Sequence, residues 1–203
     1  MSRRPIFIIL IVTVLLPSCS RCTLPLPGVS RTLSVMSYNV ENLFDDRDDG
    51  TEYREYDPGA GTWNTALYHA KLKGVSEALS LIGGGGPDIC LLQEVENERA
   101  VSDLHEGYLN VLKYGYVVVA PSEGTATTVA ALCRYRPTRV LTHRIHVLDA
   151  PPQRPILELQ FDLRGGPLVV LNMHWKSKPG GAEATEPYRL AASAFVAERV
   201  AHL

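Results

Sequence analysis

The sequence has no excess of basic residues: 20 Lys and Arg stand against 22 Asp and Glu, a formal net charge of -2. Total charge therefore gives no general attraction to nucleic acid, although it does not exclude a local basic patch. Internal repeats and low-complexity tracts are also absent. At 203 residues, with an ordinary share of apolar and charged side chains, the chain is long enough for one globular domain with a core.

The amino-terminal apolar run, Ile6 to Leu16, is too short to span a membrane. It follows two arginines and precedes small residues, which is typical of an export signal. Its ending, "LPSC", resembles the bacterial lipoprotein signal, in which Cys19 would carry the lipid, although Pro17 is unusual there. We predict that residues 1–19 export the chain as a membrane-anchored lipoprotein, periplasmic or on the cell surface. An ordinary cleaved signal and an uncleaved anchor are the alternatives.

Cysteine is scarce, with four residues in all. Residues 20–31, which include Cys22, contain Pro and Gly and predict a linker that holds the domain off the membrane. Cys90 and Cys133 both lie in apolar runs, which predicts buried thiols. A disulfide in an oxidising compartment is the alternative that the sequence leaves open.

Residues 32–203 alternate strand and helix signals, which predicts an α/β domain. A strand is expected at Leu33–Val40, and the polar stretch Glu41–Trp63 predicts a long loop of the kind that lines sites. Its acidic segment "DDRDDG" does not fit the EF-hand spacing and is expected to be solvated. Helix signals occur in a stripe from Tyr68 to Ile82, in "ERAVSDL" and in "EPYRLAASAFVAERVAHL". Further strand signals occur in "PDICLLQEV", "YGYVVVA", "TVAALCRY", "ILELQFDL" and "LVVLNMHW".

Glu94 stands where an apolar strand ends. The continuous apolar residues before it predict a strand covered on both faces, and ligands of such sheets gather where strands end. A carboxylate there is costly unless it is exposed, paired or bound to a cation, so Glu94 is a candidate ligand of a hard divalent metal. Spacing alone favours a solvated side chain, with Glu96 and Glu98 as similar surface acids.

Two other strand ends carry polar side chains. Asn39 ends its own apolar strand, where its amide suits a phosphate oxygen or a water, or simply forms a turn. His174 ends "LVVLNMHW", and Lys176 and Lys178 alternate after it, which suits a substrate phosphate. Taken singly, a structural histidine and a solvated lysine pair are the simpler interpretations. Three such strand ends together indicate one site.

These segments resemble the endonuclease/exonuclease/phosphatase family, which includes DNase I, exonuclease III and sphingomyelinases. The matching strings are "MSYNVENLFD" with Asn39, "PDICLLQEVEN" with Glu94 and "LVVLNMHWKSKPGG" with His174. The resemblance covers residues 33–203 and implies a layered α/β/β/α sandwich. It further implies that Glu94 binds Mg²⁺, or Mn²⁺ or Ca²⁺ in its place. Asn39 would support the metal and phosphate, and His174 would hydrogen-bond the scissile phosphate.

The sequence also departs from the family pattern. A "GDFN"-like motif, which orients water and phosphate, and an "SDH"-like motif, which helps generate the nucleophile, do not occur in the 203 residues. We therefore expect an incomplete sandwich without its carboxy-terminal strands. A positioned base alone is typically worth about a hundredfold to ten-thousandfold in rate. Thr127 and Thr128 stand where many relatives place a polar or acidic site residue.

Two functions of different class follow. In the first, residues 32–203 belong to an exported, metal-dependent phosphodiesterase acting on nucleic acid, weak or inactive as this chain alone. A separately encoded carboxy-terminal half, from a neighbouring reading frame, or the rest of a longer product would then complete it. In the second, the chain is a non-catalytic remnant or a membrane-tethered binding lipoprotein. A phosphatase acting on a small phosphoester is a third interpretation. Downstream DNA that encodes the absent motifs would favour the first.

Overall fold

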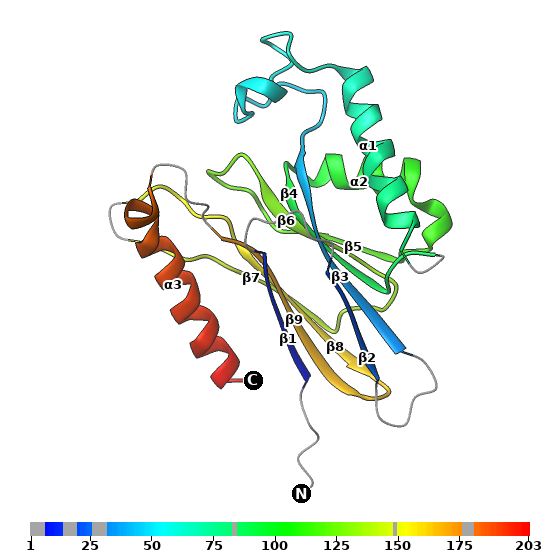
Figure 1. Ribbon diagram of the computed structural model, residues 1–203, viewed down its shortest axis with the longest axis vertical. Helices are drawn as coiled ribbons and strands as arrows, with labels where there is room; N and C mark the ends of the chain where they lie inside the picture. The colour runs from blue at the N-terminus through cyan, green and yellow to red at the C-terminus, as the bar shows by residue number, and fades with distance from the viewer. Residues whose placement is uncertain (1–6, 14–19, 26–31, 83–84, 148–149, 176–180) are drawn as a thin grey trace, which may run out of the picture.

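The domain has two β-sheets packed face to face between two layers of helices. A computed structural model describes residues 7–13, 20–25, 32–82, 85–147, 150–175 and 181–203. Helices α1 (Thr65–Ser80) and α2 (Glu98–Tyr108) lie on one side of the sheets, and α3 (Ala182–Ala201) lies on the other (Figure 1). This layering confirms the α/β/β/α sandwich that the sequence predicts.

One sheet has five strands and the other has four. The five-stranded sheet has the order β2 (Ser20–Pro25), β3 (Thr32–Leu43), β4 (Ile89–Val95), β6 (Thr128–Cys133) and β5 (Tyr116–Val119). The four-stranded sheet has the order β1 (Phe7–Thr13), β9 (Gly166–His174), β8 (Ile156–Leu163) and β7 (Arg139–His143). Strands β3 and β4 are parallel, so Asn39 and Glu94 emerge toward the same end of the sheet.

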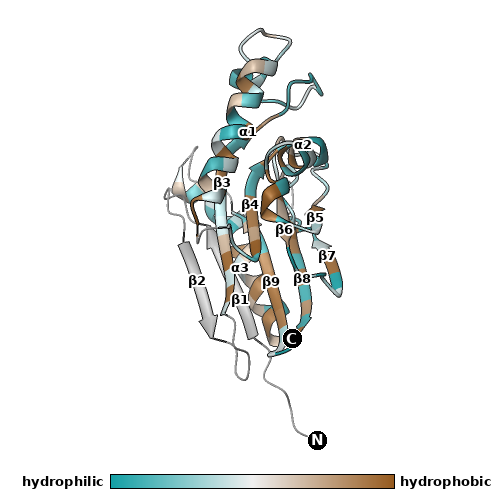
Figure 2. Cartoon of the chain, turned by 90° about the vertical axis from the view of Figure 1, so that its right-hand side faces the viewer, coloured by the Kyte–Doolittle hydropathy of each residue, from teal (hydrophilic) through white to brown (hydrophobic). Residues whose placement is uncertain are grey.

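Apolar side chains fill each of the spaces between these layers. Between the sheets lie, among others, Ile89, Val129, Leu157, Leu159 and Val170. The predicted stripe of α1 packs on the other face of the five-stranded sheet through Tyr68, Leu72, Val75 and Leu79. A smaller cluster joins α3 to the four-stranded sheet and includes Ile156, Leu171, Met173 and Val196. Figure 2 shows β4 and β9 as largely hydrophobic strands, as expected for strands covered on both faces.

Asparagine side chains cap α1 and α2. Asn64 Oδ1 accepts a hydrogen bond from the Leu67 amide, and Asn97 Oδ1 accepts one from the Ala100 amide, at 3.1 and 2.9 Å. Both contacts satisfy an amide that a helix start leaves without a partner. The cap at Asn97 starts α2 two residues after β4 ends. The short 3-10 helices η1 (Arg54–Tyr56) and η2 (Asn110–Leu112) lie in the connecting segments.

Most of the expected elements are present, and strands β1, β2 and β7 are additions. Strand β7 was not predicted, because its residues are exposed or half-buried and carry no apolar run. Cys90 packs on the helix side of the five-stranded sheet and Cys133 on the side of the other sheet. No disulfide joins them, which confirms the prediction of buried thiols.

The predicted signal and linker contain strands β1 and β2. Strand β1 pairs in parallel with β9, with Thr13 opposite His174, and β2 pairs with β3 in the antiparallel direction. Cys19 lies outside the described residues. The boundaries 1–19 and 20–31, the export signal and the lipid anchor therefore stay predictions. Among the described segments, no helix is both long and apolar enough to cross a membrane.

Candidate functional site

Glu94 and His174, which end strands of different sheets, meet at one end of the sandwich. The Oε1 atom of Glu94 lies 3.4 Å from Nε2 of His174. The Glu94 side chain is 13% exposed and the His174 side chain 4% exposed, so the pair lies at the rim of the core with limited access to water. Residues 80 positions apart are thus brought together, as the sequence predicts for one site.

A buried amide network beneath this pair holds the two sheets together. Gln93 Nε2 donates to Asn172 Oδ1 at 2.6 Å. The Asn172 Nδ2 atom donates to the carbonyl oxygens of Leu92 and Ala130 at 3.0 and 2.8 Å. Gln93 and Asn172 are both fully buried. Since Glu94 follows Gln93 directly, the network fixes the relative position of the strand ends that carry the site.

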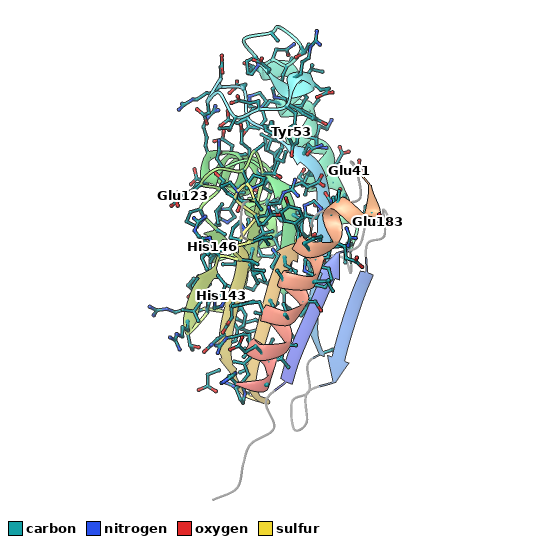
Figure 3. All side chains as sticks on the ribbon, turned by 90° about the vertical axis from the view of Figure 1, so that its left-hand side faces the viewer. Glu41, Tyr53, Glu123, His143, His146 and Glu183 are labelled. Carbon is teal, nitrogen blue, oxygen red and sulfur yellow. The ribbon has the colours of Figure 1, made fainter. Side chains whose placement is uncertain are left out.

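The backbone at these strand ends adopts a conformation that is rare outside glycine. Glu41, Asn42 and Glu94 have φ angles of 54°, 65° and 62°. The pairing of β3 with β4 shifts register between Asn39 and Leu43, and the pairing of β4 with β6 shifts between Gln93 and Val95. A left-handed non-glycine residue costs roughly 1–2 kcal/mol, and such strain is often concentrated at functional sites. Figure 3 shows Glu41 at the same end of the molecule as Tyr53.

Asn39 lies beside the Glu94 strand end. It pairs in register with Gln93, and its Oδ1 accepts a hydrogen bond from the Glu41 amide at 2.8 Å. This local bond is the turn-forming contact considered from the sequence. This bond uses one lone pair of Oδ1 and leaves the second lone pair and the Nδ2 donors for other contacts.

Two cationic side chains near the site were not predicted from the sequence. Lys71 of α1 donates to the Glu41 carbonyl at 2.8 Å. Burial lowers the pKa of Lys71, and the negative charges of Glu41 and Glu94 oppose that shift. Arg154 donates from Nε to Thr127 Oγ1 at 2.9 Å and from Nη2 to the Tyr53 hydroxyl at 3.2 Å. Neither side chain lies at the end of a strand, so the pattern of polar residues at strand ends did not indicate them.

A cavity of about 260 Å³ adjoins the histidine. Its walls include Tyr53, Arg154, His174, Trp175 and Tyr188. Figure 3 places Tyr53 in the loop after β3, above the sheets. The cavity therefore combines a cation, an imidazole and aromatic rings, which suits an anionic ester with an unsaturated or apolar substituent.

The His174 ring is uncharged near neutral pH. Burial and, to a smaller extent, the positive charge of Arg154 lower its pKa to about 4. The contact with Glu94 is therefore one between a neutral ring and a carboxylate. The Nδ1 atom is buried without a hydrogen-bond partner among the described residues. A neutral imidazole with one N–H can donate a single hydrogen bond to a ligand.

Of Lys176, Lys178, Thr127 and Thr128, only the two threonines lie in the part of the chain that the structure describes. Lys176 and Lys178 lie outside the described residues, so their role at a substrate phosphate stays a prediction. Thr127, considered as a site position, supports Arg154 and is fully buried. Thr128 instead donates to the Ala120 carbonyl at 2.9 Å, which is a structural contact within the sheet.

The expectation of Glu96 as a surface acid is wrong. Glu96 is only 3% exposed, and its Oε2 accepts from the Asp45 amide at 2.7 Å. Burial raises the pKa of Glu96 to about 8; the bond from Asp45 opposes the shift, and nearby carboxylates add to it. Asp45 in the acidic loop is also buried, whereas residues 47–50 are exposed as predicted. The left-handed turn at Glu94 changes the alternation along β4, which explains why simple spacing misplaced Glu96.

Comparison with known proteins identifies the class. Residues 34–203 match the Endonuclease/Exonuclease/phosphatase family, and the chain belongs to that family. Among solved structures, the fold is similar to TDP2 from Caenorhabditis elegans, with 21% identity and a TM-score of 0.53. A selenomethionine form of TDP2 from the same organism is similar at 19% identity and a TM-score of 0.56. Both matches cover 84% of this chain and 42% of the TDP2 chain. No curated protein matches the sequence.

Proposed function

We propose that this domain hydrolyses a phosphodiester, in nucleic acid, with a divalent cation held at Glu94. The observation that carries the proposal is the 3.4 Å contact between Glu94 and His174, which come from opposite sheets. A metal ligand and a hydrogen-bond donor in contact at a partly open rim suit a phosphoryl group bound between them. Family membership supports the reaction class.

The residues present fit a hard divalent metal such as Mg²⁺. Glu94 offers a carboxylate that is neither fully buried nor engaged by an Arg or Lys ion pair among the described residues. Asn39 offers an amide oxygen from the neighbouring strand. Mg²⁺ is commonly bound by one or two carboxylates together with waters and substrate phosphate, so this sparse donor set is sufficient. The bound metal would supply Lewis-acid polarisation and charge neutralisation at the phosphate.

The chain's own residues would bind and orient the substrate. His174 would donate an N–H to a nonbridging phosphate oxygen, and it would do so as a neutral ring, because burial and Arg154 lower its pKa to about 4. Arg154 would place a permanent positive charge in the same cavity, with its guanidinium held by Thr127 and Tyr53. Lys176 and Lys178, outside the described residues, are proposed on the sequence alone to bind the substrate phosphate. Tyr53 offers a ring for stacking on a base.

The reaction also needs a group that activates water, and the sequence contains neither the "GDFN"-like nor the "SDH"-like motif. We therefore expect hydrolysis by the 203-residue chain to be weak, and stronger in a complex with a polypeptide that supplies these motifs. The second candidate function is a domain that binds phosphodiesters without cleaving them. The first function predicts that the chain cleaves a phosphodiester and the second predicts that it does not. Both predict that the chain binds one.

A nicking assay on supercoiled plasmid with Mg²⁺ tests the proposal. We expect Glu94→Gln to abolish Mg²⁺-dependent nicking, because it removes the charge that holds the cation. The matched control is Glu106→Gln, an exposed glutamate of α2, which should nick at the wild-type rate. Nicking that is indifferent to Glu94→Gln would overturn the assignment. Binding of single-stranded DNA without any nicking would favour the binding function.

We further propose that the chain is exported and lipidated at Cys19, on the strength of its amino-terminal sequence. Incorporation of labelled fatty acid into the wild-type chain in a bacterial host, and its loss in Cys19→Ala, is the expected result. Cys22→Ala is the matched control and should remain labelled. A wild-type chain without label would refute the lipid anchor.

A further inference from the structure

A second set of acidic side chains includes neither Glu94 nor His174. Asp49, Glu52 and Glu96 each place one carboxylate oxygen within 4.8 Å of the others. Asp49 and Glu52 come from the loop after β3, whereas Glu96 follows β4. None of the ion pairs among the described residues involves these three side chains. Three carboxyl groups therefore converge without a protein cation paired to them.

The buried member of this set has an oxygen with no partner. Glu96 is only 3% exposed, and its Oε1 makes no hydrogen bond among the described residues. Its other oxygen is held by the Asp45 amide at 2.7 Å, so the carboxylate cannot turn freely. A fixed, buried and unsatisfied carboxylate oxygen next to two further carboxylates is the arrangement expected of a cation ligand.

Hydrogen bonds also hold the two loop carboxylates in place. Asn97, which caps α2, donates from Nδ2 to Asp45 Oδ2 at 3.1 Å and to Asp49 Oδ2 at 3.4 Å. The Asp49 amide donates to Glu52 Oε1 at 2.5 Å. Each of the three carboxylates thus has one oxygen engaged by a protein donor and keeps a second oxygen for a ligand.

We propose that Asp49, Glu52 and Glu96 bind Ca²⁺, which fastens the loop after β3 to the end of β4. Ca²⁺ accepts irregular sets of carboxylate, carbonyl and water oxygens, whereas Mg²⁺ demands near-ideal octahedral geometry. The set mixes one buried, one half-buried and one exposed carboxylate, which leaves room for water ligands. The same loop carries Tyr53, whose hydroxyl contacts Arg154, so the ion would stabilise one wall of the cavity.

Calorimetric titration of the chelator-treated full chain with CaCl₂ tests this site without using activity. We expect one Ca²⁺ to bind with a dissociation constant of about 10⁻⁴ M, as for moderately exposed sites. The titration is made in the Glu94→Gln background, which lacks the cation ligand of the Glu94–His174 pair. There, Asp49→Asn combined with Glu52→Gln should weaken Ca²⁺ binding at least about tenfold. Glu55→Gln, an exposed glutamate of the same loop, is the matched control and should bind as the wild type does.

Limited trypsin digestion gives a second readout. Arg47 and Arg54 are exposed in the loop, and Ca²⁺ should slow cleavage after them in the wild type and in Glu94→Gln. It should not protect the Asp49→Asn, Glu52→Gln double variant. Wild-type protein that binds no Ca²⁺ at millimolar concentration, or a double variant that binds as tightly as the wild type, would overturn the proposal. Preferential binding of Mg²⁺ would overturn the choice of ion.

Discussion

Gln93 and Asn172 form a 2.6 Å hydrogen bond between the two sheets, directly beneath the residues that form the candidate site. Asn172 uses its whole amide, because Nδ2 also donates to two carbonyl oxygens of the five-stranded sheet. A buried polar network of this kind is stabilising only while every member is satisfied. It therefore specifies how the two sheets are placed relative to each other.

Replacing Asn172 by alanine should destabilise the fold. The change removes the Asn172 partner from Gln93 Nε2, which keeps its bond to the Leu91 carbonyl, and from the carbonyl oxygens of Leu92 and Ala130. The cost is about 2–4 kcal/mol in total. Urea denaturation measures the loss in the free energy of unfolding. Asn110→Ala, at an exposed position of η2, should change it by less than about 0.5 kcal/mol. Equal effects of the two changes would show that the network contributes no stability.

Arg154→Gln should weaken the binding of a phosphate-containing ligand about tenfold, because it removes the charged donor from the cavity. Competition by inorganic phosphate in a DNA-binding assay measures this. The same variant should raise the pKa of His174 from about 4 toward its ordinary value, which NMR titration of the metal-free chain can follow. Arg136→Gln, exposed beyond β6, is the control. Unchanged phosphate competition would remove Arg154 from the site.

Protonation of Glu158 at acid pH should lower the free energy of unfolding. Burial alone would raise its pKa, but hydrogen bonds from Arg199, Gln160 and His143 lower it to about 2. A carboxyl with a pKa below its ordinary value stabilises the fold above pH 4.5, and this contribution is lost as the pH falls toward 2. The difference in pKa corresponds to about 3 kcal/mol of stability.

Glu158→Gln should therefore be less stable than the wild type at pH 7, and the gap should narrow at pH 3. Thermal denaturation at the two pH values measures it. Glu183→Gln at the exposed start of α3 is the matched control (Figure 3). A gap that stays constant between the two pH values would contradict the assignment of the stabilisation to the Glu158 charge.

Tyr114→Phe should stabilise the protein. Tyr114 is only 4% exposed, and its hydroxyl is buried without a hydrogen-bond partner among the described residues. Removing an unsatisfied hydroxyl while keeping the ring is expected to add about 1 kcal/mol to the free energy of unfolding. Tyr116→Phe, at a partly exposed ring, should have little effect. A loss of stability in Tyr114→Phe would mean that the hydroxyl has a partner such as a bound water.

Sequence reasoning succeeded where periodicity or strand ends carry the information. The stripe of α1 and the apolar strands β4 and β9 follow from side-chain spacing. The meeting of Glu94 with His174 follows from where strands end, whereas the roles of Asn39, Glu94 and His174 stay predictions. Arg154 escaped notice because it lies in a proline-rich segment and reaches the cavity through contacts with residues far away in the sequence. The burial of Glu96 was predicted wrongly because residue spacing does not reveal the left-handed backbone, with φ of 62°, at Glu94.

The pairing of β1 with β9 would affect whether the chain can be exported after it folds. Residues Phe7–Thr13 belong to the proposed export signal and also form backbone hydrogen bonds along Leu168–His174. A translocation apparatus reads such a segment only while it is accessible and extended. Folding and secretion would then compete for the same seven residues, and the order of these events would decide in which compartment each molecule ends.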